Sequence, residues 1–326
     1  MIIITGGAGF IGSQLIKKLN DLGNDNILVV DNLSDGRKIK NLNNKNIQDY
    51  IDQDLFIKKL ESGFFKKNKF ENIFHLGACT DTTELDGKFL MNNNYEYSKI
   101  LLKHALKNKI NFIYASSASI YGLGEKGFLE NPSSEMPLNA YAYSKFMFDQ
   151  FVRKTISKNE TRSQIVGLRY FNVYGPGENH KGRMSSVVNH FFQQAKETKS
   201  ISLFAGTGNI KDGEQKRDFI HVDDCIALKL WLMEQNDVSG IFNCGTGVAR
   251  TFNDIAKIIQ EWSKKELNKN LNIKYIEFPK ELVGKYQNYT CADMNSIKEI
   301  GFNYKMKSLE EGVMSYLDYL INTYKH

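Results

Sequence analysis

The sequence predicts an α/β fold, with a doubly wound parallel sheet and a smaller, discontinuous second domain. Runs rich in Ile, Val and Phe lie at residues 1–4, 27–30, 73–79, 112–117 and 165–170, and helical stretches separate them. Strands buried on both faces of a parallel sheet have this apolar character. Glycine or hydroxyl side chains follow several of these runs, at the strand ends where ligands of such folds bind.

The composition is that of an ordinary globular protein, with 326 residues, 41% hydrophobic and 25% charged, and a net charge of +6. The charges are mixed along the chain, as on a solvated surface, so we expect no nucleic acid, and the mild positive excess suits an anionic small molecule. The four cysteines form no CxxC pair and the six histidines lack metal-ligand spacing, so we expect no disulfide framework and no metal. With no recognisable signal peptide or long apolar run, we expect a cytoplasmic protein that does not bind membranes.

The N-terminal segment predicts a dinucleotide-binding turn of the Rossmann type. The strand expected at residues 1–4 leads into Gly6, Gly9 and Gly12, which have GxxGxxG spacing. Glycines at these positions permit a tight turn and let backbone N–H groups approach a pyrophosphate. An apolar stripe over residues 11–22 predicts the helix that follows, and the N-terminus of that helix favours phosphate.

The choice between NAD and NADP depends on the end of the second strand. Asp31 follows the run at 27–30, at the position where an acid usually hydrogen-bonds an adenosine ribose. Arg37 and Lys38 follow closely, and either could hold a 2′-phosphate. A solvated loop explains these two cations equally well, so the residues leave both cofactors possible.

Two residues four apart suggest an acid/base group. Tyr141 and Lys145 would lie on one face of a helix. An ammonium near a tyrosine lowers its pKa from the usual value of about 10, which suits a base near neutral pH. The pair also fits a buried Tyr beside a solvated Lys. The nucleotide-binding turn before it and the nearby hydroxyl of Ser117 favour the catalytic interpretation.

The regular alternation of predicted strands and helices becomes less clear after residue 172, where polar and glycine-rich loops interrupt it. We therefore assign residues 1–172 to the sheet domain and expect the segment of about 216–248 to return to it. Residues 173–215 and 249–326 form the predicted second domain, which would bind the substrate. An amphipathic pattern from residue 309 predicts a closing helix.

These motifs resemble the extended short-chain dehydrogenase/reductase family, whose members oxidise a sugar carbon of a nucleotide sugar with bound NAD(P). The phrases MIIITGGAGFIGS, GACTDTTELDGK, NNNYEYSK, YFNVYGPGENHKGRM and GKYQNYT are most similar to members that invert C6 of an ADP-linked heptose, a precursor of lipopolysaccharide. The resemblance covers nearly the whole chain. It implies transient oxidation with return of the hydride to the opposite face, NADP as cofactor with NAD possible, an ADP-heptose substrate, and a homo-oligomer, specifically a homopentamer.

The resemblance also implies roles for individual residues. Tyr141 and Lys181 would handle protons, Ser117 would hydrogen-bond the reacting oxygen, and Lys145 would support Tyr141. The implied cofactor contacts are Gly6, Gly9, Phe10, Ile11, Gly12, Asp31, Asn32, Lys38, Gln53, Leu76, Gly77, Ala78, Cys79, Thr80, Asn93, Tyr141, Lys145, Val173 and Lys181. The implied substrate contacts are Asn172, Arg183, His190, Phe204, Ala205, Gly206, Thr207, Arg217 and Tyr286. Gln53 replaces a family Lys that helps to hold the cofactor, and Arg183 replaces a Ser that contacts substrate.

Other interpretations remain open. Another nucleotide-sugar epimerase or a 4,6-dehydratase would share the fold, although a dehydratase usually has an Asp-Glu pair where this chain has residues 116–119, Ser-Ser-Ala-Ser. A non-catalytic NAD(P)-binding protein often lacks the Tyr or the Lys, and both are present here. Lys181 also fits a surface loop, Arg217 an ion pair with Asp218, and His190 a rim position.

Overall fold

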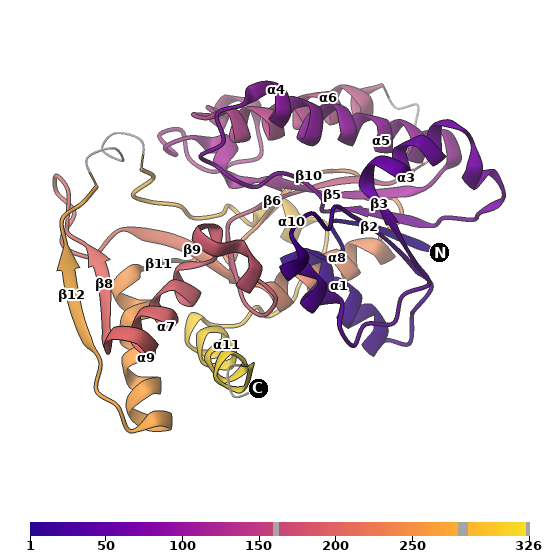
Figure 1. Ribbon diagram of the computed structural model, residues 1–326. Coiled ribbons are helices and arrows are strands. Elements are labelled where there is room, and N and C mark those ends of the chain that lie inside the picture. The colour runs from indigo at the N-terminus through magenta and orange to yellow at the C-terminus, as the bar shows by residue number, and fades with distance from the viewer. Residues whose placement is uncertain (159–162, 280–285, 324–326) are drawn as a thin grey trace.

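The computed structural model describes residues 1–158, 163–279 and 286–323 (Figure 1). Its centre is a seven-stranded parallel sheet in the order β10-β6-β5-β4-β1-β2-β3. The strands are β1 (Ile2–Thr5), β2 (Ile27–Asp31), β3 (Asp49–Asp52), β4 (Asn72–His75), β5 (Asn111–Ser117), β6 (Ile165–Tyr170) and β10 (Gly240–Cys244). The predicted doubly wound α/β fold is confirmed, and this strand order is that of the Rossmann fold with one strand added.

Helices cover both faces of the sheet, as Figure 1 shows. One face carries α1 (Phe10–Asp21), α2 (Ile39–Leu42) and α8 (Val222–Glu234), and the other carries α3 (Gln53–Glu61), α4 (Gly87–Leu90), α5 (Tyr97–Asn108) and α6 (Ala140–Ser157). Neighbouring residues of one strand enter different cores: Ile4 packs with the α1 side, whereas Ile3 packs with the α5 side. Burial on both faces explains why the strands are nearly continuous apolar runs.

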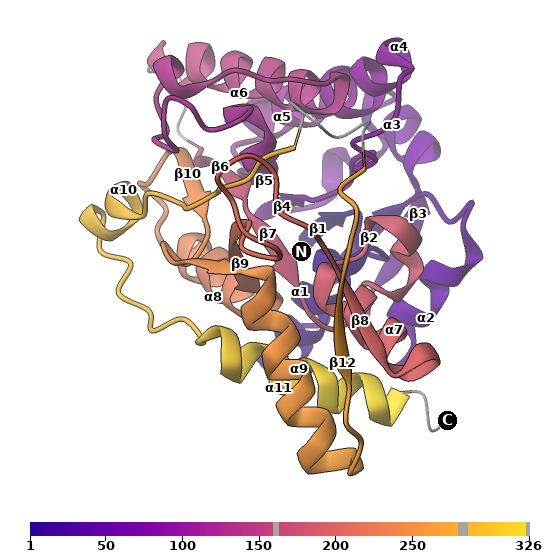
Figure 2. The ribbon, with the colours of Figure 1, turned by 90° about the vertical axis from the view of Figure 1, so that its left-hand side faces the viewer.

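A smaller part of the chain lies beside the sheet, and Figure 2 views the molecule from its side. It contains a three-stranded sheet, a two-stranded sheet and the helices of a third apolar core. These elements are β7 (Asn172–Tyr174), α7 (Val187–Thr198), β8 (Ser200–Phe204), β9 (Lys216–His221), β11 (Ala249–Thr251), α9 (Phe252–Leu267), β12 (Asn272–Ile276) and α11 (Leu309–Thr323). The predicted closing helix is therefore present as α11, and α10 (Asn295–Glu299) precedes it.

The segment of about 216–248 divides between the two parts. Strand β9 pairs with β7 and β11 in the smaller sheet, whereas α8 packs against α1 and β10 joins the edge of the central sheet. The division of the chain into two domains stays a prediction. None of the helices within the three described ranges is both long and apolar enough to cross a bilayer.

Candidate active site

A cleft of about 730 Å³ lies at the carboxyl ends of the central strands. Every residue that we expect to contact the cofactor lines this cleft, as do Ser117 and Asn172. Ligands of doubly wound sheets bind in this position. The structure therefore brings together in one cavity residues that lie up to about 175 positions apart in the chain. Their individual roles stay predictions.

The glycine-rich turn has the geometry that a pyrophosphate needs. Gly6 has a φ of +69°, in the region that favours glycine, and a Cβ on Gly12 would lie 2.2 Å from the Gly6 carbonyl oxygen. No side chain caps the N-terminus of α1, where Gly9 is the N-cap residue. The first N–H groups of this helix are therefore available to an anion, and the residues fit the diphosphate of NAD or NADP.

At the end of β2, the structure separates the two candidate cations. Lys38 lines the cleft, and its Nζ donates to Asp31 Oδ1 at 2.9 Å. Arg37 instead donates to Asp35, and its side chain is 68% exposed. Asp31 Oδ2 accepts a hydrogen bond from the backbone N–H of Ala8 at 2.8 Å. Lys38 is therefore the cation placed to reach a phosphate beside Asp31.

A π-helical turn, Met91–Glu96, holds two asparagines of the cofactor wall. Asn93 lines the cleft and accepts a hydrogen bond from Gln53 Nε2 at 3.1 Å. Asn94 is buried: its Oδ1 accepts from Cys79 N–H, and its Nδ2 donates to the Cys79 carbonyl and to Ser144 Oγ. Asn94 is not among the predicted site residues, and the only local signal for it is the run of three asparagines at residues 92–94.

Helix α6 presents the Tyr–Lys pair to the cleft. The helix begins after Asn139, whose side chain accepts a hydrogen bond from Ala142 N–H. Tyr141 and Lys145 are both buried and line the cleft. The ammonium of Lys145 donates to the carbonyl oxygen of Ala115 at 3.0 Å, which joins the helix to strand β5.

Burial dominates the acid–base properties of this pair. It lowers the pKa of Lys145 to about 8, while the negative charge of Asp149 acts in the opposite direction. Burial also raises the pKa of Tyr141, although hydrogen bonding with Ser117 opposes this rise. The prediction of a lowered Tyr141 pKa is therefore wrong for the arrangement described here, because desolvation of the phenol outweighs the hydrogen bond with Ser117.

Lys181 lies in the turn Asn179–Met184, which has no fully buried residue, and its half-buried side chain lines the cleft. Burial lowers its pKa, and Glu178 opposes this. Glu178 is itself buried in the cleft wall, where it accepts a hydrogen bond from Ser186 Oγ at 2.6 Å. Glu178 is not among the predicted site residues, because nothing local in the sequence distinguishes this acid from a solvated one.

Three of the expected substrate residues form a cluster next to the cleft. Arg217 lies 4.8 Å from the ring centroid of Tyr286, and the rings of Tyr286 and Phe204 are 6.3 Å apart. Arg217 also lies 5.9 Å from the ring of Phe252, which lines the cleft. Among the described residues Arg217 forms no ion pair, and Asp218 instead accepts backbone N–H groups from Thr246, Gly247 and Ala292. The ion-pair alternative for Arg217 is therefore wrong.

The remaining expected substrate residues lie outside the lining of the cleft. Arg183 Nη2 donates to Asp81 Oδ2 at 2.8 Å, and Asp81 belongs to the lining. His190 Nε2 lies 3.2 Å from the Arg183 carbonyl oxygen. The turn at 205–207 closes on itself, since a Cβ on Gly206 would lie 2.0 Å from the carbonyl oxygen of Ile210. The structure thus brings Arg183 and His190 to the edge of the cleft and leaves the 205–207 turn outside its lining.

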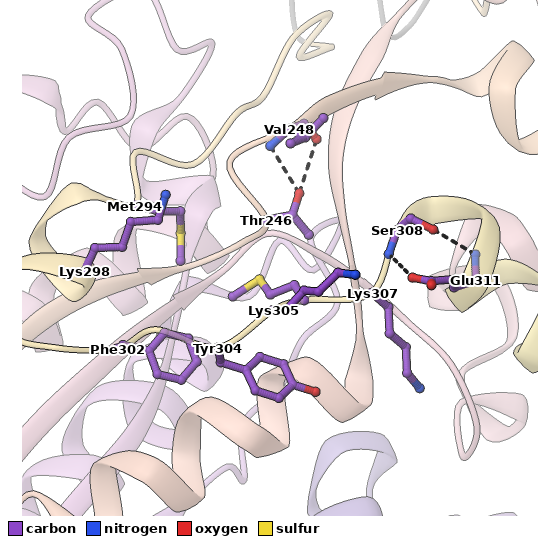
Figure 3. A pocket seen from close by; sticks show the side chains of 11 residues that line it. Thr246, Val248, Met294, Lys298, Phe302, Tyr304, Lys305, Lys307, Ser308 and Glu311 are labelled. Atoms are coloured by element: carbon purple, nitrogen blue, oxygen red, sulfur yellow. Dashed lines mark hydrogen bonds between the residues drawn. The ribbon is translucent and has the colours of Figure 1, made fainter.

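A second cavity of about 420 Å³ lies between the turn after β10 and the segment before α11 (Figure 3). Figure 3 shows that its polar groups bond to one another: Thr246 with the backbone of Val248, and Ser308 with Glu311. Lys307 lines the cavity, but its Nζ donates to Asp223 at 2.5 Å. No pair of acid/base groups converges there among the residues described, so the chemistry is assigned to the larger cleft.

Comparison with known proteins agrees with this geometry. A profile of the NAD dependent epimerase/dehydratase family matches residues 2–245. The chain belongs to this family. The matched residues include the glycine-rich turn, both members of the Tyr–Lys pair and all seven strands of the central sheet.

Known epimerases match nearly the whole chain. It is 50% identical over 320 residues to ADP-L-glycero-D-manno-heptose-6-epimerase of Brachyspira hyodysenteriae, covering 98% of both chains. The crystal structure of the Helicobacter pylori enzyme of the same name has a TM-score of 0.82 at 32% identity and covers 98% of this chain and 96% of its own. UDP-glucose 4-epimerase of Thermotoga maritima has a TM-score of 0.81 at 30% identity, with 99% of each chain covered.

Proposed function

We propose that the protein inverts C6 of the heptose in ADP-D-glycero-β-D-manno-heptose and so produces ADP-L-glycero-β-D-manno-heptose. The observation that carries the proposal is the lining of one cleft by Tyr141, Ser117 and Lys181, beside a turn that fits a dinucleotide. In this epimerisation the C6 hydroxyl group of one epimer loses its proton, and the C6 oxygen of the other epimer gains one. Two acid/base groups from different segments meet that need better than one.

The choice among nucleotide sugars follows the similarity of the sequences. The relative at 50% identity is named for ADP-heptose, whereas the relative named for UDP-glucose is 30% identical. Both are epimerases, so a UDP-hexose 4-epimerase is the second candidate. A dehydratase has less support, because the residues that follow β5 lack an adjacent Asp-Glu pair.

We infer that NADP is the preferred cofactor. NADP would accept a hydride from C6 and later return it. Glycines of the first turn and the uncapped N-terminus of α1 would hold its diphosphate, and Lys38 would hold the 2′-phosphate. Asp31 disfavours that phosphate by its charge, but the ammonium of Lys38 at 2.9 Å offsets this. NAD remains the alternative cofactor.

The side chains have separate tasks in this proposal. Tyr141 Oη would accept the proton of the C6 hydroxyl, and the hydroxyl of Ser117 would hydrogen-bond the same oxygen as it becomes a carbonyl. Burial raises the pKa of Tyr141, and the hydrogen bond with Ser117 opposes that rise by favouring the phenolate form. After the flat carbonyl group has turned, Lys181 Nζ would supply the proton on the other side. Its lowered pKa makes this transfer easier near neutral pH.

Incubation of the purified protein with ADP-D-glycero-β-D-manno-heptose, followed by NMR at C6, tests the proposed reaction. We expect an equilibrium mixture of the two C6 epimers without net oxidation of the cofactor. UDP-glucose and UDP-galactose serve as competing substrates in parallel samples. Conversion of the UDP-hexoses, with none of the ADP-heptose, would refute the proposed substrate and favour the second candidate.

We further infer that the protein acts as a homopentamer, which the resemblance of its motifs to the extended short-chain dehydrogenase/reductase family implies, and that it acts in the cytoplasm. Light scattering coupled to size-exclusion chromatography tests the subunit number directly. A mass of about five times the 37.3 kDa of one chain is expected. A monomer at micromolar concentration would refute the assembly without bearing on the reaction.

A further inference from the structure

A buried carboxylate lies one helical turn beyond Lys145. Asp149 is on α6, and its side chain has no exposed surface. It accepts hydrogen bonds from Tyr114 Oη at 2.8 Å and Ser116 Oγ at 3.0 Å, both on β5. It also accepts from Arg169 Nε at 2.9 Å, on β6. One carboxylate thus joins the helix to two adjacent strands of the sheet.

The two β5 residues that Asp149 holds lie on either side of Ala115. The carbonyl oxygen of Ala115 accepts the ammonium of Lys145 at 3.0 Å, and Ser117 is the last residue of the same strand. The β5 backbone that connects the Lys145 contact at Ala115 with Ser117 is therefore held by Asp149 through the side chains of Tyr114 and Ser116. Lys145 and Ser117 both line the cleft.

The packing around Tyr114 leaves its side chain no room to move toward β6. Gly167 on β6 faces Tyr114 across the sheet, and a Cβ at that position would lie 2.4 Å from the Tyr114 hydroxyl oxygen. The hydroxyl group is therefore confined between the strand and Asp149. A change of the carboxylate cannot be absorbed by a shift of this ring toward β6.

We propose that Asp149 is a positioning residue for the reaction: it holds strand β5 against helix α6 and so fixes Lys145 and Ser117 relative to each other. The proposal rests on the proposed function, because it takes these two residues as parts of the catalytic site. It assigns to Asp149 an effect on turnover and on the charge of Lys145, beyond the stability that any buried ion pair contributes.

The charged and titratable groups around Lys145 make its ionisation a suitable reporter. Those that face it are Asp149 on its own helix, Tyr141 one turn earlier, Cys79 in the loop after β4, and His75 at the end of β4. Asp149 supplies the nearby negative charge that keeps Lys145 protonated against the effect of burial. Removal of that charge lowers the Lys145 pKa, so the ammonium is lost at a lower pH.

Asp149→Asn is the central variant, because it keeps the shape and removes the charge. Three quantities are measured: kcat and KM for the nucleotide sugar, the pH dependence of NADPH affinity by nicotinamide fluorescence, and the melting temperature. We expect kcat to fall roughly ten- to hundredfold, with KM within about twofold of wild type. The loss of NADPH affinity at alkaline pH should begin at a lower pH than in wild type.

Glu135→Gln is the matched control. Glu135 also pairs with Arg169, and with Arg153, but it forms no hydrogen bond with β5. The Glu135→Gln variant should have a lower melting temperature than wild type, with unchanged kcat and unchanged pH dependence of NADPH affinity. An equal change in both variants would overturn the proposal, because the charge of the whole cluster would then be responsible.

Tyr114→Phe combined with Ser116→Ala removes the two links to β5 and keeps the charge. We expect a lower kcat and an unchanged pH dependence. A wild-type kcat in this double variant would overturn the proposal. So would a folded Asp149→Asn protein that keeps both the wild-type kcat and the wild-type pH dependence of NADPH affinity. If Asp149→Asn does not fold, the double variant decides. If wild-type protein does not epimerise ADP-heptose, the proposed function fails, whereas the pH dependence of NADPH affinity still tests the link between Asp149 and Lys145.

Discussion

Lys38→Ala should convert a preference for NADP into a preference for NAD. The ammonium of Lys38 is the cation placed beside Asp31, and its side chain is 23% exposed. With alanine there, a 2′-phosphate would face the buried Asp31 carboxylate without a neutralising partner. NAD, whose ribose hydroxyl is a hydrogen-bond donor to Asp31, would lose nothing comparable.

The size of the effect follows from the type of contact that is lost. A hydrogen bond to a charged group contributes about 1.5–3 kcal/mol. Since about 1.4 kcal/mol corresponds to a factor of ten, the Kd for NADPH should rise roughly ten- to hundredfold. The Kd for NADH should stay within about threefold of wild type, because removal of the cation also releases Asp31 for the ribose.

Fluorescence titration of the reduced cofactors measures both Kd values on the same protein sample. Arg37→Ala is the matched control, because this neighbouring cation pairs with Asp35 and does not line the cleft. Its two Kd values should equal those of wild type. Equal weakening of NADPH and NADH by Lys38→Ala, or the larger effect in Arg37→Ala, would refute this account of cofactor choice.

Three further outcomes are expected. Lys181→Met should reduce epimerisation at least about hundredfold; wild-type turnover, measured by NMR, would leave Lys181 without a catalytic task. Gly12→Ala should weaken cofactor binding and lower the melting temperature, since its Cβ would lie 2.2 Å from the Gly6 oxygen; a calorimetric scan matching wild type would contradict the tight turn. Because the pKa of Lys145 is lowered to about 8, its ammonium is present below that pH and lost above it, so turnover and NADPH affinity should both decline above about pH 8; profiles that stay flat to about pH 10, the usual range of lysine, would show that the charge is not needed.

The sheet and the cofactor wall could be predicted because their signals are local. A buried strand, a GxxGxxG turn and an amphipathic helix are adjacent in the chain, and each restricts what its neighbour can be. The parallel order of the strands then brings Gly6, Asp31 and Ser117 to the same edge of the sheet. The sequence did not show which of Arg37 and Lys38 lies in the cleft, because the two residues are adjacent and the local backbone conformation decides which side chain points there.

The rest of the site depends on contacts between distant segments. Arg217, on β9, lies against Tyr286, which belongs to a segment about 70 residues further along the chain. Asp149 meets residues from β5 and β6. No local pattern marks either arrangement. The helical spacing of Tyr141 and Lys145 was sufficient to predict a shared face, but not that Lys145 would donate to Ala115 or that burial would raise the Tyr141 pKa.

Three of the hydrogen bonds of Asn94 hold two segments of the site together. They attach the cofactor-side turn at Cys79 to helix α6 at Ser144, so these two segments form one rigid block. Rearrangement within that block would require a buried amide to give up its partners. We therefore expect Cys79 and Ser144 to keep their spacing when ligands bind, and any adjustment to the shape of a ligand to occur outside these two segments.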